Sequence, residues 1–251
     1  MDKRIDNLIK NWQRRNILGF YCENKEQAVD KILEVIPASS SIGISGSVTL
    51  DQLGIVRRLE SRGNKLFNQY KSGISREESL ELRSQGARQA DYFLTSANAI
   101  SEKGELVFFS GYGNRTAGIS YAKNVIVVAG INKITSNIQE ALKRSREYAT
   151  PLNCKRLSWS TPCFEDGICR QEICLFPEYK RMCCQILIIE AEVTPDRPEG
   201  RGLASDSQSH RPEGRGLASD SQSHRPEGRG LASDSQSHRL KVILVGENLG
   251  F

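Results

Sequence analysis

The run NVIVVAG at residues 124–130 decides the fold. All of its residues after Asn124 are apolar or glycine, so a strand here has no polar face and must be covered on both sides. Such strands are typical of parallel sheets that lie between two layers of helices. On its N-terminal side, GYGNR (111–115) opens a predicted helix that runs to about Ala122, and residues 100–110 predict a hairpin that turns at Lys103-Gly104.

Helices and strands alternate outward from this run. Apolar residues at helical spacing predict helices over 2–15, 26–36, 48–59, 76–88 and 135–148. Short apolar runs predict strands over 19–22, 41–47, 65–69 and 91–97, with two more candidates at 186–193 and 240–245. This alternation predicts an α/β fold with a three-layer, mostly parallel sheet.

One 14-residue unit, RPEGRGLASDSQSH, occurs three times without change over 197–238. Each copy is formally neutral and has no aromatic residue, so it cannot bury enough surface to offset the entropy of ordering. We therefore expect a disordered tandem-repeat insertion; the alternative is a binding array that uses His210, His224 and His238 for metal. The predicted organisation is an α/β domain over 1–158, a cysteine-rich segment over 159–185, and C-terminal strands over 186–196 and 239–251 that complete the domain.

All three histidines of the chain lie in these repeats. Ser-His-Asp triads, Cys-His dyads and His-ligated zinc sites are therefore not expected in the folded part. Any acid–base chemistry in the folded part must therefore use carboxylates, Lys, Tyr or Cys.

Composition and charge limit the classes of partner that we expect for this protein. The formal net charge is +5, and no block of Lys and Arg is interleaved with aromatic residues, so no nucleic-acid partner is expected. No apolar stretch approaches about 18 residues, so no membrane span is expected. The N-terminal stretch MDKRIDNLIKNWQRRN lacks the apolar core of a signal peptide, so we expect a cytoplasmic protein with reduced thiols.

Two glycine-containing loops follow predicted strands and open predicted helices. The first carries Gly46, Ser47 and Thr49, and the second carries Gly113, Asn114 and Arg115. Ligands of open parallel sheets bind beyond the carboxyl ends of the strands, where free N–H groups at helix starts attract anions. The alternative is that the glycines serve the turns alone and that Ser47 or Asn114 caps a helix. Neither loop has the Lys-Ser/Thr ending of a Walker A loop or the full G-x-G-x-x-G pattern.

Four linked motifs resemble the short LUD-domain ("lactate utilization" domain) proteins: TSANAISEKGELVFFSGYGNRTAGISYAKNVIVVAGINKI (95–134), PLNCKRL (151–157), TPC (161–163) and GSVTLDQLGI (46–55). The resemblance implies a fold similar to the ribose-5-phosphate isomerase and CoA-transferase group, with a ligand cleft at the strand ends. Some family members belong to a bacterial system that oxidises L-lactate.

Carried over by position, the resemblance implies ligand-binding roles for the residues of both loops and for Asn98 and Asn132. It implies catalytic roles for Glu105, as a base or nucleophile, and for Lys133, which could neutralise an anion. The alternatives are that Glu105 is a solvated hairpin residue and that Lys133 caps a strand end. Arg115 suits a carboxylate or a phosphate.

The cysteine-rich segment has the spacing C-x5-C-x4-C-x8-C-C. Several nearby thiolates suit tetrahedral zinc or an iron–sulfur cluster, and the predicted ligands are Cys163, Cys169, Cys174 and Cys183. Compared with the cysteine-bearing tail of short family members, a C-x2-C pair is missing here. The alternative is a set of reduced thiols without a metal. Cys22 and Cys154 lie far off in the sequence and are predicted to be core or loop residues.

Three hypotheses about function follow. The first is an enzyme or enzyme component that acts on a small carboxylate and binds an anionic ligand, either a carboxylate or a phosphate. The second is a metal-bearing electron-transfer or accessory subunit with a redox partner protein. The third is a ligand sensor without catalysis.

Overall fold

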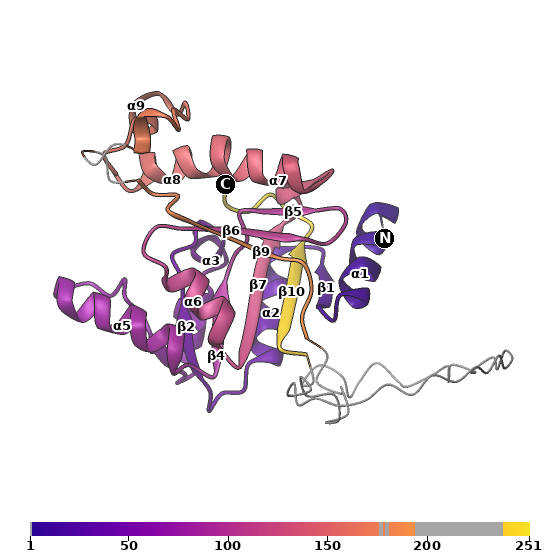
Figure 1. Ribbon diagram of the computed structural model, residues 1–251. Helices are drawn as coiled ribbons and strands as arrows, with labels where there is room; N and C mark the ends of the chain where they lie inside the picture. Colours follow the sequence, from indigo (N-terminus) through magenta and orange to yellow (C-terminus); the bar gives the residue numbers. More distant parts are fainter. Residues whose placement is uncertain (1, 176–177, 179–180, 194–237) are drawn as a thin grey trace, which may run out of the picture.

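Six parallel strands form the main sheet of the computed structural model, in the order β1-β10-β7-β4-β2-β3 (Figure 1). The structure describes residues 2–175, 178, 181–193 and 238–251, so the predicted repeats fall outside it except for His238. The strand bounds are β1 Leu18–Cys22, β2 Ser41–Ile44, β3 Lys65–Phe67, β4 Tyr92–Thr95, β7 Asn124–Gly130 and β10 Leu240–Val245. The prediction of an α/β fold with a mostly parallel sheet is confirmed.

Strand β7 shows why its sequence has no polar face. Val125, Val127 and Ala129 point into one hydrophobic core, and Ile126 and Val128 point into a second core on the other face of the sheet. Its neighbour β10 alternates in the same way, with Leu240, Val242 and Leu244 on the first side and Ile243 and Val245 on the second. The period of two along each strand thus divides the apolar residues between the two cores.

Helices cover both faces of this sheet. The second core is closed by α2 (Lys25–Val35), α3 (Val48–Leu53) and α4 (Ile55–Ser61). The opposite face carries α1 (Lys3–Arg14), α5 (Arg76–Arg88) and α6 (Asn114–Tyr121). In the described part of the chain, no helix has the length and apolar composition needed to cross a bilayer.

A smaller sheet lies beside the main one, in the order β8-β5-β6-β9. The predicted hairpin forms its centre as β5 (Ala99–Ser101) and β6 (Leu106–Ser110), flanked by β8 (Ile134–Thr135) and β9 (Gln185–Ile189). One face of this sheet joins the first core, and the other packs against α7 (Ile138–Arg144). The candidate strand at 186–193 is therefore the shorter β9, which runs antiparallel to β6, whereas the candidate at 240–245 is β10 of the main sheet.

Two predicted helices differ from the structure. The helix expected over 48–59 is broken into α3 and α4 at Gly54, whose φ of 61° lies in the left-handed region. The helix expected over 135–148 begins later, at Ile138, because Asn137 caps it by accepting a hydrogen bond from the Glu140 amide. It continues through a π-helical turn, Ser145–Ala149, into α8, Thr150–Arg156.

Candidate anion-binding site

A cavity of about 270 Å³ lies beyond the carboxyl ends of β2, β4 and β7. Both glycine loops reach it: the first follows β2 and starts α3, and the second starts α6. The predicted site residues that line it are Gly46, Ser47, Thr49, Asn98, Asn114, Arg115 and Lys133. Strand ends are where open parallel sheets bind ligands, because loops there are free to vary around a rigid scaffold.

Arg115 joins the two loops across this cavity. Its Nη1 donates to the side-chain oxygen of Asn98 at 3.1 Å and to the carbonyl oxygen of Phe109 at 2.9 Å. Its Nη2 donates to the carbonyl oxygen of Gly46, and its Nε lies 3.4 Å from the Ser45 hydroxyl. All these acceptors are neutral, so the guanidinium is held in place without a counter-charge from the described residues.

Lys133 lies at the end of β7 with only 4% of its surface exposed. Its Nζ donates to the Ser96 hydroxyl at 2.8 Å, to the Thr49 hydroxyl at 2.9 Å and to the Ala97 carbonyl at 3.0 Å. Burial, followed by the positive charges of Arg144 and Arg115, holds the pKa of Lys133 well below its usual range. Lys133 therefore loses its proton at a lower pH than an exposed lysine does.

Two more arginines, Arg83 of α5 and Arg156 of α8, line the same cavity. The Nε of Arg83 is buried and has no hydrogen-bond partner among the described residues. No aspartate or glutamate side chain of the described residues lines the cavity, and none of its four cations takes part in a described ion pair. The cavity thus concentrates positive charge that the described residues leave unneutralised.

Aromatic rings form another part of the cavity wall. Tyr112 and Trp159 meet edge to face with ring centroids 5.8 Å apart, and the guanidinium of Arg83 lies over the Tyr112 ring at 4.7 Å. Tyr112 is more than half exposed, so this wall adjoins solvent. The rings give a ligand an apolar surface beside the cationic groups.

Gly113 and Asn132 lie next to the cavity and do not line it. Gly113 has a φ of 83° at the start of α6, a conformation that glycine adopts without strain, and its carbonyl accepts the first helical hydrogen bond of α6, from Ala117. Asn132 binds the last residues of the chain: its side chain accepts from the Leu249 amide at 3.1 Å and lies 3.4 Å from the Gly250 carbonyl. Both residues therefore position the walls of the cavity.

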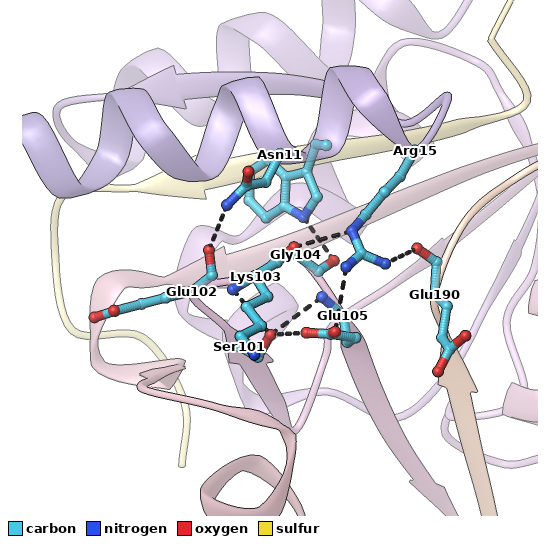
Figure 2. Close-up of polar contacts among 9 residues, drawn as sticks. Asn11, Arg15, Ser101, Glu102, Lys103, Gly104, Glu105 and Glu190 are labelled. Carbon is cyan, nitrogen blue, oxygen red and sulfur yellow. Dashed lines mark hydrogen bonds and ion pairs between the residues drawn. The ribbon is translucent and has the colours of Figure 1, made fainter.

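Glu105 lies on the hairpin turn, outside the cavity lining (Figure 2). Its carboxylate accepts from Ser101 and forms an ion pair of 3.2 Å with Arg15, which follows α1. Burial acts to raise the pKa of Glu105, but the Ser101 hydroxyl and Arg15 outweigh it, so the pKa is lowered. These contacts tie Glu105 to the docking of α1, where Trp12 Nε1 also donates to the Gly104 carbonyl at 3.1 Å.

Five cysteines border a second, much smaller cavity of about 10 Å³, which we call the cysteine hollow. They are the predicted Cys163, Cys169, Cys174 and Cys183, together with Cys154 of α8. Burial raises the pKa of Cys154 to about 12 and also raises the pKa values of Cys169 and Cys174, so these thiols are protonated. Over the described ranges, no three Cys, His, Asp or Glu side chains are placed so that they could hold a metal ion.

Several residues that line the cavity are not among the predicted site residues. Ser96 follows β4 in the polar turn of DYFLTSA, a signal that was available in the sequence, because that turn ends a strand. Arg83 and Arg156 lie on helices that carry other charged residues, so their sequence pattern does not distinguish them from neighbouring charged residues that point into solvent. Cys154 was predicted to be a core or loop residue, and its place at the cysteine hollow depends on the packing of α8 against α9 (Cys163–Asp166).

The fold and the cavity define the chain as an α/β protein with a cationic pocket at the ends of parallel strands. The family model of the LUD domain matches residues 5–197, and the chain belongs to this family. No curated protein matches the chain.

Two solved structures are similar in part. A DUF162 family protein from Deinococcus radiodurans is 12% identical, with a TM-score of 0.37, over 56% of this chain and 75% of that one. Ribose 5-phosphate isomerase from Plasmodium falciparum is 18% identical, with a TM-score of 0.30, over 45% of this chain and 52% of that one.

Proposed function

We propose that this chain binds a small anionic molecule, a carboxylate or a phosphate, in the cavity at the strand ends. One observation carries the proposal: Arg83, Arg115 and Arg156, together with Lys133, line a single cavity to which no aspartate or glutamate side chain of the described residues contributes. A buried cation without a counter-charge is costly, and a bound anion removes that cost. Arg115 is the main anchor, because its position is fixed by four acceptors and one N–H of Nη2 is left for a ligand.

Family membership supports a more specific role. As the LUD resemblance implies, we propose that the chain serves in the oxidation of lactate or a related small carboxylate. The ligand would lie with its anionic group near Arg115 and Lys133 and its apolar part against Tyr112 and Trp159.

Calorimetric titration of the full chain with L-lactate, ribose 5-phosphate and inorganic phosphate tests the proposal. We expect at least one of them to bind, and Arg115→Gln to weaken that binding by roughly 100-fold, because charge-assisted hydrogen bonds of this kind contribute about 3 kcal/mol. The matched control is Arg239→Gln, since Arg239 is paired with Glu192 outside the cavity lining. Absence of binding by all three probes would remove the proposal.

A second candidate is a metal-bearing accessory role, with a redox partner protein, at the cysteine hollow. It requires the cysteine side chains to move together, because no three of the described ones are placed to hold a metal ion. Two buried atoms of its lining, Arg146 Nε and Arg181 Nη1, have no hydrogen-bond partner among the described residues. Such donors suit the negative charge of a zinc–thiolate or iron–sulfur centre, whose sulfurs accept hydrogen bonds. Cys163 and Cys183 would be among the ligands, because they line the same hollow as Cys154, Cys169 and Cys174.

Metal uptake would have to displace the protons of these thiols, so it would release protons and strengthen with rising pH. Anaerobic purification followed by elemental analysis and a visible spectrum tests this candidate. About one zinc ion, or iron with inorganic sulfide, should accompany each wild-type chain and should fall in the double variant Cys163→Ser/Cys183→Ser. A metal-free, colourless wild-type protein would reject it.

A further inference from the structure

Ser96, Thr49 and Lys133 form a closed polar cluster on the cavity wall. The Ser96 hydroxyl lies 2.8 Å from Lys133 Nζ and 3.1 Å from the Thr49 hydroxyl, and Thr49 in turn lies 2.9 Å from Nζ. All three side chains line the cavity, and each is at most 4% exposed. The hydroxyls and the amine therefore adjoin the proposed ligand while bulk water has little access to them.

This cluster can hold its protons in two ways. With an ammonium, Nζ donates to both hydroxyls and to the Ala97 carbonyl. With a neutral amine, Nζ donates to Thr49 and Ala97 and accepts from Ser96, while the Thr49 hydroxyl can turn toward the Leu249 carbonyl, 3.5 Å away. Every polar atom keeps a partner in both arrangements. The neutral arrangement has one proton fewer, which the amine has lost, and the Ser96 hydroxyl then donates to Nζ in place of accepting from it.

The surroundings favour the neutral amine. Lys133 is buried, and the charged groups that act on it are Arg144 of α7 and Arg115 of α6, both positive. In the described residues, neither the loops that carry Thr49 and Ser96 nor the segment 249–250 presents a carboxylate side chain to it. A neutral amine within hydrogen-bond reach of a hydroxyl is the arrangement of a general base and its nucleophile.

We propose that Ser96 is a nucleophile that Lys133 activates, and that the cavity takes a small carboxylic ester which itself carries a negative charge. This proposal rests on the proposed anion-binding function, since the arginines of the cavity, Arg83, Arg115 and Arg156, hold the charged end of the ester away from Lys133. Ser96 Oγ attacks the ester carbonyl carbon as its proton moves to Lys133 Nζ. The bond from that carbon to the leaving oxygen then breaks, and Nζ returns the proton to the leaving alcohol.

The acyl group is left on Ser96, and a water molecule attacks its carbonyl carbon as Lys133 Nζ again takes a proton. The bond from that carbon to Ser96 Oγ then breaks, and Nζ returns the proton to Oγ. The products are the carboxylic acid and the free hydroxyl of Ser96, so atoms and charges balance without another reactant. The cationic lining stabilises the oxyanion formed at each attack. Thr49 positions the amine, because it bridges Lys133 and Ser96.

Incubation of the full chain with mono-p-nitrophenyl succinate, an ester with one free carboxylate, tests the proposal. We expect release of p-nitrophenolate and a succinyl group on Ser96, found by intact mass and peptide mapping. Ser96→Ala should abolish the adduct, and Lys133→Met should slow its formation by roughly 100-fold or more. Ser145→Ala, which removes a buried serine outside the cavity lining, should react like the wild type.

Two further readouts separate a catalytic pair from a structural one. The acylation rate of the wild type should rise with pH through an apparent pKa below the usual lysine value, and this rise should vanish in Lys133→Met. Titration of the wild type and of Ser145→Ala with inorganic phosphate reports on the anion site separately, and both should bind it equally. A wild type that binds phosphate but neither releases p-nitrophenolate nor carries a Ser96 adduct would overturn this inference and leave the anion site standing, whereas a chain that also fails to bind phosphate would overturn both.

Discussion

The Nη1 atom of Arg115 and the Oδ1 atom of Asn98 lie 3.1 Å apart, and the same Oδ1 accepts the backbone N–H of Phe109 at 2.9 Å. Asn98 thereby orients Arg115 through a neutral acceptor. We predict that Asn98→Asp, which keeps the shape and the acceptor but adds a negative charge, will lower anion affinity about tenfold or more, because it neutralises the guanidinium. Titration with the best of the three probes measures the effect.

Asn132→Asp is the matched comparison. Asn132 does not line the cavity, and its side-chain oxygen accepts from the Leu249 amide, as a carboxylate would also do. Its replacement should change anion affinity less than threefold, a difference of well under 1 kcal/mol. Equal losses in the two variants would mean that Asn98 acts through general charge and not through Arg115.

The pH dependence of stability should report on Lys133. Its pKa is lowered on folding, so between the folded value and 10.5 the unfolded chain binds more protons than the folded chain. The free energy of unfolding contributed by this group therefore rises with pH through that window and levels off above it. Urea unfolding at several pH values should show this rise in the wild type and not in Lys133→Met. An anion that binds beside Lys133 should cause proton uptake, seen as a binding enthalpy that depends on the buffer.

The ion pair of Arg15 with Glu105 should stabilise the docking of α1 and leave the cavity unaffected. We predict that Glu105→Gln lowers the free energy of unfolding by about 1 kcal/mol at neutral pH, because the pair is partly buried, and leaves anion affinity unchanged. The pKa of Glu105 is lowered on folding, so its contribution is present above the unfolded value and is lost as the pH falls through the folded one. The wild type and the variant should therefore converge in stability in acid. A loss of anion affinity would instead assign Glu105 to the site.

Helix α5 approaches β2 through two glycines. A Cβ atom on Gly43 would lie 2.1 Å from the Gly86 carbonyl oxygen, which is backbone and cannot turn away. Gly43→Ala should cost about 3 kcal/mol of unfolding free energy, as overpacked cores do. Gly54→Ala is the control: a Cβ there meets no atom within 4 Å, and its positive φ should cost about 1 kcal/mol. Urea unfolding measures both variants, and equal free energies of unfolding for Gly43→Ala and Gly54→Ala would contradict this close approach.

The sequence was sufficient to predict the central strands β7 and β10 of the main sheet because they are buried on both faces. The runs 124–130 and 240–245 are apolar at nearly every position. A continuous apolar run of this short length is typical of a strand that is buried on both faces. The hairpin at 100–110 was predicted as a hairpin, but local pattern does not show that it belongs to a second sheet. That assignment depends on pairing with β8 and β9, which lie far off in the sequence.

The cavity was predictable where a strand end and a glycine coincide, as at Gly46 and Arg115. Glu105 shows the limit of carrying a role over by position: it is near Asn98 in the sequence, yet the hairpin turns it toward α1. Arg83 and Arg156 reach the cavity from helices whose exposed residues are charged throughout, so only the packing of these helices singles them out.

The position of β10 between β1 and β7 has a consequence for synthesis of the protein. Within the described residues, Leu18 and its neighbours in β1 find their sheet partner at Lys241 and beyond. During translation, α1 and β1 leave the ribosome long before that partner exists. Their apolar residues lack this partner until β10 is made and inserts between β1 and β7.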